Sequence, residues 1–288
     1  MSKVWLVTGS SRGLGRCIVE AALAAGDSVV ATARDPRTLD DLIAQHGSAK
    51  LCAVAHDVTD AAAALAAVQK ALDTFGRLDV VVNNAGYGHV APFEQADPDD
   101  FRAQIDTNFY GVVHTTRAAL PVMRAQKSGH IIHVSSVGGR MGTPGLAAYQ
   151  SAKWAVGGFT EVLREEVKAF DIKVTAVEPG GMRTGWGPEA RDSLPPLLPD
   201  YEVTLGPLVA MFDQYVGNET GSPSRVADVI VQLTRHDDPP AHLLLGSDAV
   251  HYASVADAAR AEAGARWRDV SISTDGSRTD PIAPLPHS

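Results

Sequence analysis

Two residues in the middle of the chain have the types and spacing needed for proton transfer. Tyr149 and Lys153 are four positions apart, so on a helix both side chains project from one face. A free phenol has a pKa of about 10, which makes it a poor acid or base near neutral pH, and a nearby ammonium favours the phenolate. The spacing therefore predicts that Lys153 lowers the pKa of Tyr149, which then exchanges a proton with a substrate oxygen.

A serine is placed to complete this pair. Ser136 lies 13 residues before Tyr149, after the apolar run His130–Ser135, which has the pattern of a strand. In a parallel sheet, ligands bind beyond the carboxyl ends of the strands. A hydroxyl at that place can donate a hydrogen bond to a carbonyl or alkoxide oxygen. Strand alternation and the glycines that follow favour Ser136 over its neighbour Ser135.

A glycine-rich loop near the start of the chain has the pattern of a phosphate cradle. Between a strand-like run and a helical stretch, the sequence reads Thr8-Gly9-Ser10-Ser11-Arg12-Gly13-Leu14-Gly15. We expect Gly9 to allow a tight turn, Gly13 to let a pyrophosphate approach the backbone, and Gly15 to let the helix pack on the strand. The N-terminus of that helix would offer free N–H groups to the phosphates. A purely structural glycine turn is the alternative.

The charge after the second strand bears on the choice between NADP(H) and NAD(H). Arg34 lies 19 residues after Gly15, near the usual spacing of about 20 for the residue that contacts the adenosine ribose. An arginine can pair with a 2′-phosphate, which a carboxylate repels. Arg12 adds positive charge nearby, and Arg37 is a further candidate. We therefore expect NADP(H) to be preferred; the alternative is that Asp35 binds the ribose hydroxyls of NAD(H).

Short apolar runs alternate with helical stretches along the chain. The strand-like runs are Val4–Thr8, Ser28–Ala33, Leu51–Ala55, Val80–Asn83, His130–Ser135, Ile172–Val177 and His242–Leu245. The helical stretches are Arg16–Ala25, Arg37–His46, Ala61–Phe75, Asp100–Gln126, Leu146–Phe170, Pro223–Arg235 and Ala249–Arg268. This order predicts an α/β fold in which a parallel sheet is covered by helices on both faces.

The composition excludes several classes of protein. The 288 residues carry a net charge of 25 − 34 = −9, which argues against a nucleic acid or an anionic membrane as partner. No run of about 18 apolar residues predicts a membrane span. Cys17 and Cys52 are too few for a disulfide framework, and no Cys/His cluster has metal-ligand spacing, so we expect no metal. With no pattern of a signal peptide, these features predict a cytoplasmic protein.

Taken together, the motifs resemble the short-chain dehydrogenase/reductase family over about residues 3–250. The matching motifs are Thr8–Gly15, Asn83-Asn84-Ala85-Gly86, Asn108-Phe109-Tyr110-Gly111, Ser136, Tyr149-x-x-x-Lys153 and Pro179-Gly180. The resemblance implies a doubly wound Rossmann fold with seven parallel strands in the order 3-2-1-4-5-6-7. The runs Asn-Ala-Gly-Tyr-Gly at residues 84–88 and Ala-Thr-Ala-Arg-Asp at residues 31–35 look most similar to the branch with retinol and 17β-hydroxysteroid dehydrogenases, which suggests lipophilic substrates.

The resemblance also implies roles for single residues. Tyr149 would be the general acid/base, and Ser136 would polarise the substrate oxygen. Lys153 would tune the tyrosine and bind the nicotinamide ribose, while Asn108 would hold a water that relays protons. The cofactor-binding residues predicted by the glycine motif and the resemblance are Gly9, Ser11, Arg12, Gly13, Leu14, Gly15, Arg34, Asp57, Val58, Asn84, Ala85, Gly86, Tyr149, Lys153, Pro179, Gly180 and Thr184.

These features predict an NADPH-dependent carbonyl reductase, or the matching secondary alcohol dehydrogenase. Its substrate would be a small hydrophobic ketone, aldehyde or alcohol of steroid, retinoid or polyketide type. The alternatives are NAD-dependent alcohol oxidation at the same site and a non-catalytic, NADP-binding regulatory protein. The intact set of Asn108, Ser136, Tyr149 and Lys153 disfavours the regulatory protein. A sugar-nucleotide epimerase is disfavoured because the chain has little room for a C-terminal sugar domain.

The chain is expected to form one domain over residues 1–272, followed by a disordered tail, 273–288. Residues 182–221 contain five prolines and many large apolar residues, among them Trp186 and Phe212, and predict a substrate lid over an apolar pocket. About 40 residues follow Asp248 and would obstruct the edge-strand interface of tetrameric relatives. We therefore expect a homodimer formed through the helices Asp100–Gln126 and Leu146–Phe170, with a monomer as the alternative.

Overall fold

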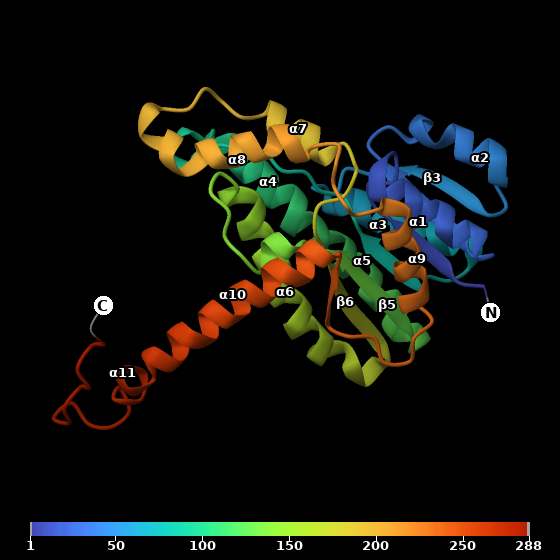
Figure 1. The fold of residues 1–288 in the computed structure, drawn as a ribbon. Helices are drawn as coiled ribbons and strands as arrows, with labels where there is room; N and C mark the ends of the chain where they lie inside the picture. Colours follow the sequence, from blue (N-terminus) through green and yellow to red (C-terminus); the bar gives the residue numbers. More distant parts are fainter. Residues whose placement is uncertain (1, 287–288) are drawn as a thin grey trace.

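A seven-stranded parallel sheet with helices on both faces forms the body of the protein in the computed structural model, which describes residues 2–286 (Figure 1). The strands are β1 (Val4–Val7), β2 (Ser28–Ala33), β3 (Leu51–Ala55), β4 (Val80–Asn83), β5 (Gly129–Val134), β6 (Ile172–Pro179) and β7 (His242–Leu245). Their order is β3-β2-β1-β4-β5-β6-β7, and every neighbouring pair is parallel. The predicted fold class and strand order are confirmed.

The central strands consist of buried, mostly β-branched residues. Every residue of β1, β2 and β4 is buried, and Trp5 of β1 pairs with Val29 on one side and Val80 on the other. A strand covered on both faces needs apolar side chains at successive positions, which is why these runs do not alternate with polar residues. The edge strand β7 is only half-buried along its length.

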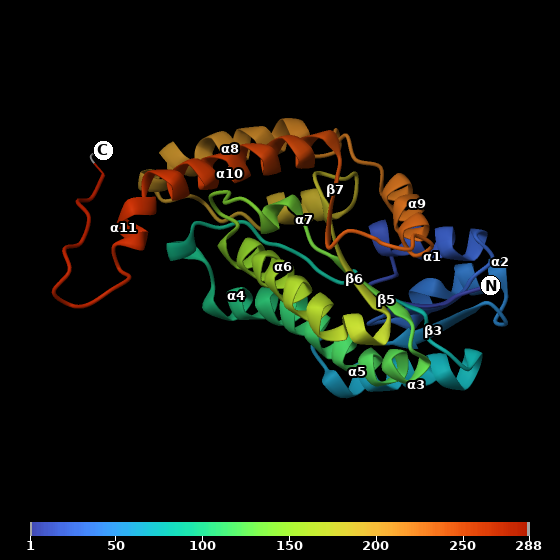
Figure 2. The same cartoon turned by 90° about the horizontal axis from the view of Figure 1, so that it is seen from below.

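Helices cover both faces of this sheet (Figure 2). The longer ones are α1 (Gly13–Ala24), α2 (Asp40–His46), α3 (Ala61–Phe75), α4 (Pro98–Ile105), α5 (Gly111–Gln126), α6 (Ala147–Val167), α8 (Glu202–Tyr215), α9 (Pro223–Leu233) and α10 (Ser247–Arg266). Residues of α1, α2 and α9, such as Ile18 and Ile230, form one core layer with the strands. Residues of α3, α5 and α6, such as Ala119 and Leu163, form the other.

The predicted helix Asp100–Gln126 is present and begins two residues earlier, at Pro98, but it contains a π-helical turn that was not predicted. The structure has α4, then a π-helical turn at Asp106–Tyr110, then α5. Within the turn, the Asn108 side-chain amide donates to the carbonyl of Gln104, four residues earlier, and to that of Tyr87, both at 2.8 Å. Turns of this kind are frequent at functional sites, and here the turn buries Asn108 completely.

The segment predicted as a lid contains the short helix α7 (Trp186–Asp192) and α8. After β7, α10 extends away from the body and ends in the short helix α11 (Arg268–Ile272) (Figures 1 and 2). Residues 273–286 contain neither helix nor strand, and residues 287 and 288 of the predicted tail lie outside the described residues. Within residues 2–286, no helix combines the length and apolar composition needed to span a bilayer.

Candidate active site

Ser136, Tyr149 and Lys153 lie together beyond the carboxyl end of β5. Ser136 is the second residue after that strand, and its hydroxyl lies near enough to the Tyr149 hydroxyl to lower the pKa of the phenol. Lys153 follows one turn along α6, with its Nζ 5.5 Å from the centre of the Tyr149 ring. The Nζ donates to the carbonyl of Val134 at 2.8 Å, which fixes the buried ammonium at the end of the strand.

The two neighbouring serines have different surroundings. The Ser135 hydroxyl is buried and donates to the backbone carbonyl of Lys153 at 3.3 Å. The Ser136 hydroxyl accepts from the N–H of Gly138 at 3.0 Å and contacts Tyr149. Only Ser136 therefore presents its hydroxyl to the tyrosine, in agreement with the choice made from the strand pattern.

The predicted direction of the Tyr149 pKa shift is wrong. Burial raises the pKa of Tyr149 above its ordinary value, and the nearby Ser136 hydroxyl offsets only part of that effect. Burial also lowers the pKa of Lys153 to about 8, so its positive charge is itself disfavoured there. Both shifts favour the neutral forms of the two groups, so the phenol stays protonated at neutral pH.

Asn108 and Lys153 approach the same glycine from two sides. The Asn108 Oδ1 is buried and has no hydrogen-bond partner among the described residues, while both protons of its Nδ2 are taken. A Cβ atom placed on Gly86 would lie 2.5 Å from this oxygen and 3.6 Å from Lys153 Nζ. Gly86 thus lets the open acceptor of Asn108 lie against the main chain near the ammonium, where a side chain would collide with the oxygen.

The glycine loop forms a tight cradle between β1 and α1. Gly9 has a φ of +65°, and a Cβ there would lie 2.8 Å from the Cα of Ala85. A Cβ on Gly15 would lie 2.2 Å from the Gly9 carbonyl oxygen, so the helix packs directly on the loop. The Asn84 side chain donates to that carbonyl at 3.1 Å. Helix α1 begins after Arg12 without a side-chain cap, so its first N–H groups are free for an anion.

A cleft of about 630 Å³ lies above this cradle. The lining residues that were predicted to bind the cofactor are Gly9, Ser11, Arg12, Gly13, Arg34, Asp57, Val58, Asn84, Ala85, Gly86 and Thr184. Lining residues that were not assigned to the cofactor are Ala33, His56, Thr59, Tyr87, His89, Thr107, Gly185, Trp186 and Glu189. His56 and Thr59 flank the Asp57-Val58 pair, so their position in the chain could have indicated them. No sequence signal distinguishes Glu189.

Six predicted cofactor residues do not line this cleft: Leu14, Gly15, Tyr149, Lys153, Pro179 and Gly180. The Leu14 side chain is 6% exposed and packs in the core, so only its backbone N–H, at the uncapped start of α1, can contact a ligand. Gly15 supports the loop from below, because its Cα faces the Gly9 carbonyl. Gly180 is covered by the Asp248 carboxylate, which would collide with a Cβ at that position.

The charges at the end of β2 leave one arginine free. Arg37 binds both carboxylate oxygens of Asp35, at 2.9 and 2.8 Å, and this pairing holds the pKa of Asp35 below its usual range. The prediction that Arg37 adds positive charge for a phosphate is therefore wrong. Arg34 is exposed and forms no hydrogen bond or ion pair within residues 2–286. Arg12 pairs with Glu189 of α7 at 2.5 Å.

The groups around the cleft fit a dinucleotide. The uncapped start of α1 and the glycine cradle suit a pyrophosphate, because added Cβ atoms would fill the space where the backbone must approach it. Arg34 offers an unpaired cation at the adenosine end. Asn108 offers an unpaired acceptor next to Lys153 at the other end.

The segment 182–221 covers Tyr149 with apolar side chains. Leu208 and Phe212 of α8 are buried against Val90 and Leu146, and the rings of Tyr149 and Trp186 pack on this cluster. Other apolar residues of the segment remain exposed, including Leu198 and Met211. The segment therefore packs on the body and covers part of the Tyr149 ring.

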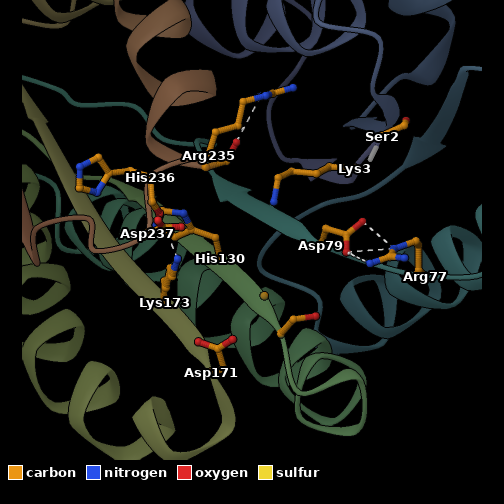
Figure 3. Close-up of a pocket in the computed structure, with 13 residues that line it drawn as sticks. Ser2, Lys3, Arg77, Asp79, His130, Asp171, Lys173, Arg235, His236 and Asp237 are labelled. Atoms are coloured by element: carbon orange, nitrogen blue, oxygen red, sulfur yellow. Dashed lines mark hydrogen bonds and ion pairs between the residues drawn. The ribbon is translucent and has the colours of Figure 1, made fainter.

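A second cavity, of about 540 Å³, lies at the opposite edge of the sheet, near the starts of β1, β4, β5 and β6 (Figure 3). Its charged groups largely satisfy one another: Arg77 pairs with Asp79 at 2.7 Å, and Lys173 donates to the His236 carbonyl at 3.0 Å. Burial lowers the pKa of His130 to about 3, so this residue is neutral. Ligands of open parallel sheets bind at the carboxyl edge, where Tyr149 lies.

Comparison with known proteins defines the family. The family model described as short chain dehydrogenase matches residues 3–194. Oxidoreductase BOA17 of Botryotinia fuckeliana is 47% identical over 274 residues, covering 95% of this chain and 100% of that protein. A short-chain dehydrogenase structure from Streptomyces avermitilis superimposes with a TM-score of 0.86 at 38% identity, over 96% of this chain and 100% of that one. The chain belongs to the short-chain dehydrogenase/reductase family and is an NAD(P)-dependent oxidoreductase of CH–OH and C=O groups.

Solved relatives contain both nicotinamide cofactors. A metagenomic short-chain oxidoreductase in complex with NADP is 29% identical, with a TM-score of 0.68, over 85% of this chain and 97% of that one. A 3-ketoacyl-(acyl-carrier-protein) reductase from Brucella melitensis in complex with NADH is 27% identical, with a TM-score of 0.70, over 84% of this chain and 96% of that one. A curated relative, 3-ketodihydrosphingosine reductase of Bacteroides thetaiotaomicron, is 38% identical over 184 residues, 64% of this chain and 65% of that protein.

Proposed function

We propose that this chain is an NADPH-dependent carbonyl reductase for a hydrophobic ketone or aldehyde. The observation that carries the proposal is the Ser136–Tyr149 hydroxyl pair, with buried Lys153 one turn further along α6, beyond the carboxyl end of β5. A hydrophobic substrate is supported by the apolar side chains that enclose Tyr149, among them Leu208 and Phe212. A curated relative whose name denotes a keto-group reductase also supports reduction.

Tyr149 and Ser136 would act on the carbonyl oxygen. NADPH, when bound, supplies a hydride to the carbonyl carbon. The Ser136 hydroxyl would hydrogen-bond to the oxygen on which negative charge develops. The Tyr149 hydroxyl would donate its proton to that oxygen, and the raised pKa keeps this proton in place at neutral pH. Alcohol oxidation needs the phenolate instead.

Lys153 and Asn108 would restore the proton that Tyr149 loses. Lys153 has a pKa lowered to about 8, so its Nζ exchanges protons readily near neutral pH. The open Oδ1 of Asn108 lies across the Gly86 position from that Nζ and can accept from a bridging water. In this proposal Lys153 would also bind the nicotinamide ribose.

The preference for NADP(H) would come from Arg34. Its guanidinium is unpaired within residues 2–286, whereas the competing Asp35 carboxylate is occupied by Arg37. The cradle around Gly9, Ser11 and Gly13 would hold the pyrophosphate. Further residues in this proposal contact the adenine, the ribose or the nicotinamide. They are Arg12, Asp57, Val58, Asn84, Ala85, Gly86, Pro179, Gly180 and Thr184.

The assembly and location belong to the same proposal. Trp154 and Val162 of α6 are 45% and 60% exposed, and apolar side chains on an exposed helix face favour a homodimer through α5 and α6. Both cysteines are free thiols, which suits a reducing cytoplasm. A single domain over residues 1–272 with a lid at 182–221 also stays a proposal, as does the likeness to the retinol and 17β-hydroxysteroid dehydrogenase branch.

The experiment is a screen for carbonyl-dependent oxidation of NADPH. Steroids, retinoids, quinones and short ketones are each added to enzyme and NADPH, and the alcohol product is identified by mass spectrometry. We expect at least one hydrophobic carbonyl compound to be reduced, and NADPH to support a higher rate than NADH. NADPH binding without reduction of any carbonyl compound would favour the regulatory alternative instead.

A further inference from the structure

Trp186, the first residue of α7, lies directly against Tyr149. The two ring centres are 5.3 Å apart, with an angle of 48° between the ring planes. Gly88 lies beside the contact, because a Cβ on it would come within 3.0 Å of the Tyr149 ring and 3.1 Å of the Trp186 ring. The indole of Trp186 therefore packs on the ring whose hydroxyl would hold a carbonyl compound.

The indole N–H of Trp186 is a buried donor without an acceptor. No hydrogen-bond partner lies within reach of its Nε1 in the described part of the chain. The surrounding side chains are apolar and include Val90, Leu208 and Phe212. An indole nitrogen can only donate, whereas the other unpartnered buried atoms in residues 2–286 are carbonyl or carboxylate oxygens and histidine nitrogens. Leaving a buried donor unpaired is unfavourable, and a ligand that brings an acceptor removes that penalty.

We propose that Trp186 selects carbonyl substrates that carry a second acceptor oxygen close to the reacting carbonyl group. This inference rests on the proposed reductase function and names its substrate class: β-keto esters and related 1,3-dicarbonyl compounds with an apolar remainder. Tyr149 and Ser136 hold the reacting oxygen, and the Trp186 N–H donates to the second oxygen. The apolar side chains of α8 contact the rest of the molecule.

Such a contact discriminates against substrates that lack the acceptor. A site built to hydrogen-bond to a substrate rejects the analogue without that group, because its own buried polar atom is then left unpaired. The second oxygen does not react, so its hydrogen bond stabilises ground state and transition state alike and acts mainly on KM. We expect roughly a tenfold effect on kcat/KM, the size usual for one hydrogen bond.

The test compares ethyl 3-oxohexanoate with 4-nonanone, which has the same length and lacks the ester oxygens. The keto ester is intrinsically more reactive, so the measured quantity is the ratio of the two kcat/KM values in wild type divided by the same ratio in Trp186→Phe. Phenylalanine keeps an aromatic ring and removes the N–H. Trp186→Leu is made beside it, and NADPH binding shows that each variant is folded.

We expect the ratio to fall roughly tenfold in Trp186→Phe and Trp186→Leu, chiefly through a higher KM for the keto ester. Phe212→Leu is the matched control, because it alters the same apolar cluster without removing a donor. In this variant the kcat/KM values for both substrates should change by the same factor, so that their ratio stays at the wild-type value. An unchanged ratio in the Trp186 variants would overturn the inference and leave the reductase function standing.

The same measurements separate the two proposals. Two results for the wild-type enzyme would also overturn the assignment of substrate class. The first is an equal kcat/KM for 4-nonanone and the keto ester. The second is reduction of other carbonyl compounds but of neither of these two. Failure to reduce any carbonyl compound while NADPH still binds would be a failure of the proposed function itself.

Discussion

At the scale of single residues, burial decides the chemistry of the site more than charge does. Tyr149 and Lys153 have the spacing for an acid–base pair, yet burial raises the pKa of the phenol and lowers that of the amine to about 8. Both shifts favour the neutral forms. For reduction this is useful, because the proton that the carbonyl oxygen needs is already on Tyr149.

In the proposed function Arg34 selects NADP(H), and its removal should be visible in binding alone. We expect Arg34→Ala to raise the Kd for NADPH by roughly 10- to 100-fold, since a hydrogen bond to a charged group contributes about 1.5–3 kcal/mol. The Kd for NADH, which lacks the 2′-phosphate, serves as the internal control and should change little. Equal losses for both cofactors, measured by fluorescence titration, would assign Arg34 a general role rather than selection.

At the scale of elements, close backbone contacts bring the loop, the strand and the helix into position. The contact between Gly15 and the Gly9 carbonyl brings α1 onto the end of β1 and aims its free N–H groups at the cleft. The π-helical turn at Asp106–Tyr110 turns Asn108 toward Gly86 and Lys153. The first feature depends on a short distance to a main-chain oxygen, which side-chain motion cannot relieve, and the second on hydrogen bonds from the Asn108 side chain to two backbone carbonyls.

Gly15→Ala tests the contact between loop and helix. Its Cβ would lie 2.2 Å from a backbone oxygen, so the helix must move. We expect a loss of about 1–3 kcal/mol in the free energy of unfolding, the usual cost of overpacking, together with weaker NADPH binding. Urea unfolding and a binding titration measure the two effects.

Gly264→Ala is the matched control for this variant. Gly264 lies in α10 with nothing within 4 Å of its added Cβ, so alanine should stabilise the helix by about 0.5–1 kcal/mol. If Gly15→Ala proved as stable as Gly264→Ala, the close approach of α1 to the loop would not be needed for the fold.

The strands could be predicted from the sequence because parallel strands buried on both faces are continuous apolar runs. The bounds of β2, β3, β4 and β7 were predicted without error. The π-helical turn could not be predicted, because it depends on the Tyr87 carbonyl, which comes from a loop distant in the chain. The direction of the Tyr149 pKa shift could not be predicted for the same reason. The burial of Tyr149 depends on Trp186 and the segment 182–221, whose position no local sequence pattern specifies.

At the scale of the whole molecule, the main prediction that stays open is a homodimer formed through α5 and α6. Trp154 and Val162 expose apolar surface on α6, and Arg260 of α10 lies over the Trp154 ring at 5.2 Å. We expect light scattering to give twice the mass of one chain. Val162→Glu should lower that value to a single chain, because it places a charge in the buried centre of the dimer contact. A tetramer, or a dimer unaffected by this change, would contradict the proposed interface.

The central claim is that the Tyr149 hydroxyl delivers the proton during carbonyl reduction beside the nicotinamide. The most direct test measures kcat for carbonyl-dependent NADPH oxidation, and the Kd for NADPH, in wild type and Tyr149→Phe. The account predicts that kcat falls roughly 100- to 10,000-fold while the Kd changes less than about threefold, since only the proton donor is lost. A Tyr149→Phe enzyme with wild-type kcat would contradict it.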